Sequence, residues 1–201
     1  MAEIEKIHQA LPTATHHVDA AWDVVMAQIR AAMAQRGVHP SHTVVVLPFA
    51  QLMGQAKQAW RRTQGDAEHS YFLPRFETTQ NWARGLGGFA PGADDVTQDA
   101  ARDALTAASL LARTGLAEHE NTLASRLMEA AWSLARLAAA QPPSARAAWG
   151  AALADSLVEG MVTPVLALEA ATARIALAWA ASSAYASDAL FAAQPALVVV
   201  P

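Results

Sequence analysis

The chain of 201 residues contains no cysteine. Thiolate zinc sites, iron–sulfur clusters and thiol catalysis are therefore excluded within it. Long apolar runs are also missing, because the most hydrophobic stretch has only 13 uncharged residues between Arg174 and Asp188, whereas a membrane span needs about 20. The first residues carry acids and no apolar signal segment. We therefore expect a cytoplasmic protein with no membrane contact.

Motifs of the common catalytic sites are missing as well. The sequence has no G-x-x-x-x-G-K-[ST], no G-x-G-x-x-G after a strand and no G-x-S-x-G. Its seven histidines lack the spacing of zinc ligands. Asp95, Asp99 and Asp103 recur every four residues, and we interpret them as favourable charges at a helix N-terminus. We therefore predict that the chain is not an enzyme and holds no cofactor or metal.

Charge is distributed unevenly around a formal net charge of -4. Residues 54–86 carry 5 basic and 3 acidic side chains, whereas residues 87–201 carry 6 basic and 11 acidic ones. Proteins that bind nucleic acid concentrate Lys and Arg on one face. Only the 54–86 segment favours such binding.

The first half of the chain alternates between helical and strand patterns. Apolar residues at helical spacing predict a helix over 15–36 that stops at Gly37. The β-branched run 43–47, closed by Pro48, predicts a strand buried on both faces. A helix over about 50–63, a short strand at 71–73 and a brief helix carrying Trp82 follow.

Beyond the glycine-rich linker near residue 87, alanine-rich segments predict four helices. They cover about 95–113, about 116–140, 144–160, and a last one capped by Thr163 with Pro164 at its first position. The second helix has one apolar stripe, made of Leu123, Leu127, Ala130, Leu134 and Leu137. These helices predict a bundle.

The final run 196–200, closed by Pro201, repeats the pattern of 43–48 and predicts another strand. An apolar strand of this kind needs neighbours on both sides. The fold class is therefore a helix-dominated α/β fold: a small parallel sheet of about three strands flanked by helices, with a large all-α insertion. The predicted domains are a partial helicase-like α/β region (1–86), a helical-bundle insertion (87–194) and a returning strand (195–201). We expect the chain to be the N-terminal part of a longer protein.

One group of residues suggests a binding function. The basic side chains are Lys57, Arg61, Arg62, Arg75 and Arg84, and Trp60, Tyr71, Phe72, Phe76 and Trp82 are interleaved with them. Arginines beside flat rings can hold a single-stranded backbone and stack its bases. In the competing interpretation, the cations complement a helix C-terminus and the aromatic rings fill a core.

The segments Thr43 to Pro48, Trp60-Arg61-Arg62 and Phe72 to Thr79 with Trp82 resemble the early part of the AddB-type subunit of bacterial helicase–nucleases, related to inactivated superfamily I helicases. In that family the same order precedes a large helical insertion, after which the sheet resumes; Val198 to Pro201 would be the resuming strand. Functional helicases place a glycine loop before the strand at Val44 and a hydroxyl residue where Phe49 stands. The resemblance thus implies that ATP hydrolysis is lost.

The resemblance implies a noncatalytic scaffold in a larger protein of DNA repair and recombination, whose nuclease lies outside this chain. Its expected partners are single-stranded or duplex DNA and a helicase motor subunit. The alternative is a helical protein-interaction module with no contact to nucleic acid.

Overall fold

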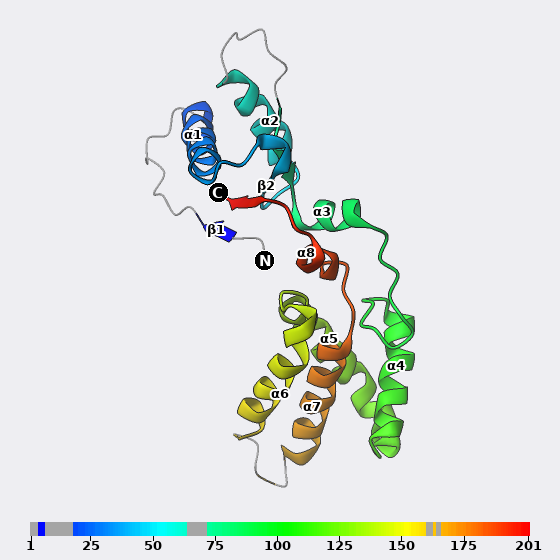
Figure 1. Ribbon diagram of the computed structural model, residues 1–201. Coiled ribbons are helices and arrows are strands. Elements are labelled where there is room, and N and C mark those ends of the chain that lie inside the picture. Colours follow the sequence, from blue (N-terminus) through cyan, green and yellow to red (C-terminus); the bar gives the residue numbers. More distant parts are fainter. Residues whose placement is uncertain (1–3, 7–17, 64–71, 160–162, 164–165) are drawn as a thin grey trace. The chain divides into compact units, whose positions relative to one another are not determined.

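The computed structural model describes residues 4–6, 18–63, 72–159, 163 and 166–201. The chain divides into two compact units (Figure 1). Unit 1 comprises Met1–Gly87 and Ala192–Pro201, and unit 2 comprises Gly88–Phe191. Unit 1 holds a parallel sheet, and the described part of unit 2 is helical. The predicted class, a helix-dominated α/β fold with a large helical region, is confirmed.

Unit 1 contains a four-stranded parallel sheet in the order β1-β4-β2-β3. Its described elements are β1 (Ile4–Lys6), α1 (Val18–Arg36), the 3-10 helix η1 (Pro40–His42), β2 (Thr43–Val46), α2 (Leu52–Arg62), β3 (Arg75–Glu77), α3 (Thr79–Leu86) and β4 (Leu197–Val200). The sheet therefore has one strand, β1, more than the predicted three.

The predicted strand at 71–73 is wrong. Phe72 and Leu73 are not in a strand, Tyr71 lies outside the described residues, and β3 begins at Arg75. The pairing partner fixes this position: Arg75 is in register with Val44, and the two residues after it continue the ladder. The local apolar pattern could not reveal that register.

The last strand occupies the interior of the sheet. On one side β4 pairs with β1, and on the other side it pairs with β2, with Val198 in register with both Ile4 and Val44. Leu197, Val198 and Val199 are buried. This explains why an uninterrupted apolar run is tolerated here, since a central parallel strand is shielded on both faces and both edges.

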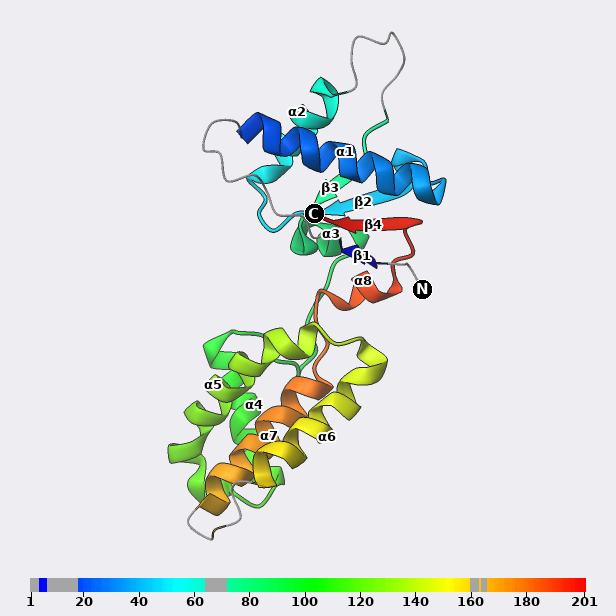
Figure 2. The same cartoon turned by 90° about the vertical axis from the view of Figure 1, so that its left-hand side faces the viewer.

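Helices cover the two faces of this sheet differently. Alternate residues Val45, Phe76 and Val199 point into a core with α1 and α2, whereas Val44 lies on the opposite face near Trp82 of α3. Figure 2 shows α1 above the strands and α3 below them. Crossovers between parallel strands are right-handed. The connections from β1 to β2 and from β2 to β3 run across the sheet in one direction and therefore lie on one face. The connection from β3 to β4 runs in the opposite direction and therefore lies on the other face.

The end of α1 follows a Schellman arrangement at the predicted stop. Gly37 has a left-handed φ of 62°, and the Val38 N–H donates to the Met33 carbonyl at 3.0 Å. Glycine adopts this conformation without steric cost. The prediction of a helix ending at Gly37 is therefore confirmed.

Unit 2 contains α4 (Ala100–Arg113), the 3-10 helix η2 (Ala117–His119), α5 (Glu120–Ala139), α6 (Pro143–Glu159), α7 (Ala167–Ser182) and most of α8 (Asp188–Ala192). The predicted starts of α4 and α7 were too early, since Asp99 caps α4 and α7 begins at Ala167 rather than beside Thr163. The short helix α8 was not predicted. Of the segment before α7, Pro164 lies outside the described residues.

The bundle of unit 2 is built by close packing of small side chains. Helix α5 packs against α4 and α7, and α6 packs against α7. At the α6–α7 contact, a Cβ added to Gly150 would lie 2.6 Å from the Ala181 Cβ. Glycine is therefore required for this close approach of the two helices.

The buried stripe of α5 differs from the predicted one. Leu123 and Leu127 are buried as expected, but the stripe continues through Ala131, Ala135 and Ala138, and Leu137 is 56% exposed. The predicted stripe assumed alternating steps of four and three residues. A straight helix turns about 100° per residue, so such a stripe gradually moves around the helix and leaves the buried face.

We predict that Leu127→Ala lowers the free energy of unfolding by about 2–5 kcal/mol, because it empties a fully buried position. The matched control is Leu137→Ala on the same helix, which should change it by less than about 0.5 kcal/mol. Urea unfolding followed by circular dichroism measures both. Equal effects of the two substitutions would contradict the burial pattern of α5.

Candidate nucleic-acid interface

Lys57 and Arg61 lie one turn apart on the exposed side of α2. The opposite side of this helix is fixed by three buried residues, Ala56, Ala59 and Trp60. Within the described part of the chain, neither cation has a carboxylate or hydrogen-bond partner. Both side chains are therefore available to bind an anion.

Arg62 is occupied by contacts inside the protein. Its guanidinium donates to the Asp23 carboxylate at 2.7 Å and to the Asp19 carboxylate at 2.8 Å. It also donates to the Asp19 backbone carbonyl at 3.1 Å. The hydrogen bond to Asp23 is the main cause that raises the pKa of Arg62 above its ordinary value. Arg62 thus joins α2 to α1 and is not free for a ligand.

Arg75 and Arg84 lie on other elements. Arg75 is exposed on the edge strand β3 and forms a long ion pair, 3.6 Å, with Glu77. Its guanidinium lies beside Gly85 of α3. Arg84 is exposed in the last turn of α3 and has no partner among the described residues. The five predicted cations therefore lie on three elements: three are on α2, of which Arg62 is paired with Asp19 and Asp23, and the other two are on β3 and α3.

Most of the interleaved aromatic rings belong to the core. Trp60 and Phe76 are buried against each other, with ring centroids 6.3 Å apart. Trp82 is a buried residue of α3. Phe72 is 55% exposed, and Tyr71 lies outside the described residues. The core interpretation therefore holds for three of the rings, and Phe72 is the member of the group that faces solvent.

The carboxylates near α4 serve the local structure. Asp99 caps the helix by accepting from the Ala101 and Arg102 N–H groups at 3.0 and 3.1 Å. Asp103 is fully buried and accepts from the Thr97 hydroxyl at 2.7 Å and from the Trp132 indole at 2.6 Å. Among the described residues, no three histidine, aspartate or glutamate side chains are placed to hold a metal ion.

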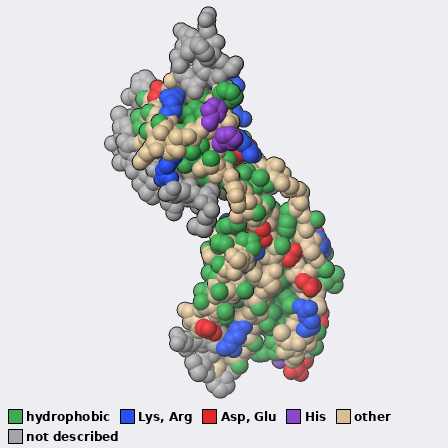
Figure 3. All heavy atoms as spheres, in the orientation of Figure 1, with side chains coloured by type: hydrophobic (Ala, Val, Ile, Leu, Met, Phe, Trp, Pro, Cys, Tyr) green, Lys and Arg blue, Asp and Glu red, His purple; other side chains and the backbone are tan. Residues whose placement is uncertain are grey.

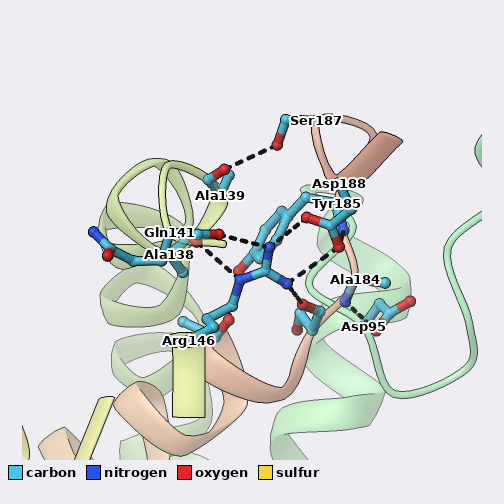
Figure 4. Close-up of polar contacts among 11 residues, drawn as sticks. Asp95, Ala138, Ala139, Gln141, Arg146, Ala184, Tyr185, Ser187 and Asp188 are labelled. Atoms are coloured by element: carbon cyan, nitrogen blue, oxygen red, sulfur yellow. Dashed lines mark hydrogen bonds and ion pairs between the residues drawn. The ribbon is translucent and has the colours of Figure 1, made fainter. Parts of the chain in front are cut away.

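Arg146 of α6 is a buried guanidinium that the sequence analysis did not single out (Figure 4). It donates to the backbone carbonyls of Ala138, Ser183 and Gln141 at 2.9, 2.8 and 3.2 Å. A signal for it exists in the sequence, because Arg146 is the only charged residue between Arg136 and Asp155. A lone cation in an apolar helix is a candidate for a buried, fully bonded site.

The counter-charge of Arg146 comes from Asp188 of α8. Two guanidinium nitrogens pair with the two carboxylate oxygens, a bidentate geometry that strengthens the bond. The guanidinium also lies over the Tyr185 ring, 4.9 Å from its centroid. This cluster ties α6 to the segment that follows α7.

We predict that Arg146→Lys lowers the free energy of unfolding by about 3–5 kcal/mol, because an ammonium cannot replace the guanidinium bonds and leaves Asp188 poorly paired. The control is Arg136→Lys on the exposed surface of α5, which should be nearly neutral. Chemical denaturation measures both variants. A neutral Arg146→Lys substitution would show that the cluster does not stabilise the fold.

Burial raises the pKa of the Tyr185 hydroxyl to about 12, and the nearby Arg146 charge opposes part of this rise. The sequence has two tyrosines, so a Tyr71→Phe variant reports Tyr185 alone. We predict a tyrosinate absorbance midpoint near pH 12 when the variant is folded and near pH ~10 when it is denatured. The associated stability is present below pH ~10 and is lost as pH rises towards the folded value. A folded midpoint near ~10 would contradict the burial of this hydroxyl.

No helix in the described part of the chain is long and apolar enough to cross a membrane. Comparison with known proteins gives no match: no family model, curated protein or solved structure is similar to this chain.

Proposed function

We propose that this chain is a noncatalytic, helicase-like α/β unit with a helical insertion. It acts as a scaffold that holds single-stranded DNA or a motor partner within a larger DNA-repair protein of the helicase–nuclease type. The observation that carries the proposal is the return of the chain to the interior of a parallel sheet after the helices of unit 2. This order of strand, helix, strand, insertion and resuming strand is the one that the resemblance of residues 42–83 to AddB-type proteins leads us to expect.

The noncatalytic part of the proposal is supported by the connections that leave the carboxyl ends of the strands. Ligands of open parallel sheets bind at these ends, where helicases hold phosphates with glycine-rich backbone and a lysine. Here the segments 7–17 and 47–51 contain neither glycine nor lysine. The residues needed to cradle a triphosphate are therefore missing from both positions.

The DNA part of the proposal is supported by charge. Unit 1 carries 8 basic and 7 acidic side chains, whereas unit 2 carries 6 basic and 11 acidic ones. A polyanion is therefore repelled by unit 2 and directed towards unit 1. On the surface of α2, Lys57 and Arg61 form a cationic turn with no carboxylate partner among the described residues, which fits a contact with backbone phosphates.

We predict that the double substitution Lys57→Glu with Arg61→Glu weakens binding of a single-stranded oligonucleotide about tenfold or more at low salt. It should also reduce the slope of log affinity against log salt by about 1.4, the value expected for the loss of two phosphate contacts. The matched control is Arg113→Glu with Arg126→Glu. These residues are exposed on unit 2 and have no partner among the described residues, and the change in net charge is the same.

Fluorescence anisotropy over a salt series measures these effects. An equal loss in the two double variants would mean that total charge, and not the α2 surface, controls binding. Hydrolysis of ATP by the purified chain would contradict its noncatalytic role.

A protein-interaction module is the second candidate, and the surface of unit 2 favours it. Leu105 and Leu137 are exposed on α4 and α5 of this acidic unit, where they could contact an apolar partner. A pull-down with and without nuclease treatment separates the two functions, because only a DNA-bridged partner is lost when the nucleic acid is digested.

A further inference from the structure

Three exposed rings lie at the amino-terminal edge of the unit 1 sheet. His39 precedes η1, His42 ends it, and Phe72 lies shortly before β3. The His39 ring meets the Phe72 ring edge-on, with centroids 4.6 Å apart, and lies 6.4 Å from the His42 ring. All three residues are exposed, and Figure 3 shows the described histidine side chains of unit 1 side by side on the surface.

Hydrogen bonds to neighbouring residues hold two of these three residues, His39 and Phe72, in place. The His39 Nδ1 accepts from the Ser41 N–H at 3.3 Å and lies 2.7 Å from the Ser41 hydroxyl, which fixes the ring at the start of η1. The Phe72 carbonyl accepts from the indole of the buried Trp60 at 3.3 Å. Phe72 is therefore tied to the core of unit 1 through Trp60, although it lies on a connecting segment.

A hollow of about 270 Å³ adjoins this cluster. Its wall includes His42, Arg75, Trp82 and the segment 193–196 that leads into β4. Arg75 has five N–H donors, and its one carboxylate contact within the described ranges, Glu77, is 3.6 Å away. Most of these donors are therefore available to an anion in the hollow.

We propose that this edge of unit 1, with its rings from His39, His42 and Phe72 and the guanidinium of Arg75, is a base-stacking site for single-stranded DNA. A base stacks on the exposed face of Phe72, whose orientation the edge-on imidazole of His39 supports, and Arg75 binds the adjacent phosphate. A flat ring beside a guanidinium is the usual combination for a single strand, whose bases are free to leave the stack. The inference rests on the proposed function in taking single-stranded DNA as the ligand, and it adds a base-contacting surface to the phosphate contacts of α2.

The test compares two probes of equal length, an oligothymidylate and an abasic strand that keeps the phosphates but has no bases. Phe72→Ala should weaken oligothymidylate binding about tenfold, the loss expected for one stacked base, and should leave binding of the abasic strand unchanged. Arg75→Gln should weaken both probes. The control is Phe49→Ala, since Phe49 is 64% exposed in the same unit but follows the other end of β2.

Each result has a defined meaning. Oligothymidylate affinity that is unchanged in Phe72→Ala, or lowered equally in Phe49→Ala, overturns the stacking site. If Lys57→Glu with Arg61→Glu still weakens both probes in that case, the proposed function stands without it. Failure of the parent chain to bind either strand overturns the stacking site and the DNA part of the proposed function. Thermal unfolding midpoints of the Phe72 and Phe49 variants close to that of the parent show that the folded structure is kept.

Discussion

Burial of the β4 strand is the constraint on which unit 1 depends. Leu197, Val198 and Val199 fill the interior of the sheet between β1 and β2, and no other described segment supplies these contacts. Without β4, the buried edges of both neighbours would expose unpaired N–H and C=O groups. The helices of unit 2 lie between β3 and β4 in the sequence. Unit 1 can therefore complete its sheet only after the chain has passed through the insertion.

The same constraint explains which elements were predictable. The strands β2 and β4 are short β-branched runs bounded by proline, and their apolar character reflects burial on both faces. Strand β1 is an edge strand of three residues, Ile-Glu-Lys, whose sequence has no such signal. Strand β3 pairs on one side and alternates exposed and buried residues over only three positions. Its place follows from register with β2, which is a tertiary property.

The sequence predicted which segment carries the cations and aromatic rings of the candidate interface, but not which of these side chains are exposed. Arg61 and Arg62 are adjacent in the sequence, but successive helix residues point about 100° apart. One therefore faces solvent while the other meets Asp19 and Asp23 of α1. The aromatic residues divide in a similar way, since Trp60 and Phe76 complete the core and Phe72 remains outside it. Which side chains remain free depends on how α1 and α2 pack, and the local sequence does not contain that information.

Unit 2 shows how a bundle rich in alanine obtains a defined structure. Alanine side chains bury little area and have similar shapes, so apolar packing alone discriminates weakly between neighbouring alignments of the helices. Arg146 bonds the carbonyl groups at the end of α5 and the end of α7, and Asp103 bonds the segment before α4 and Trp132 of α5. A shift of one helix would leave these buried charges without partners, at a cost of several kcal/mol. The two polar clusters therefore fix the alignment that the small side chains leave open.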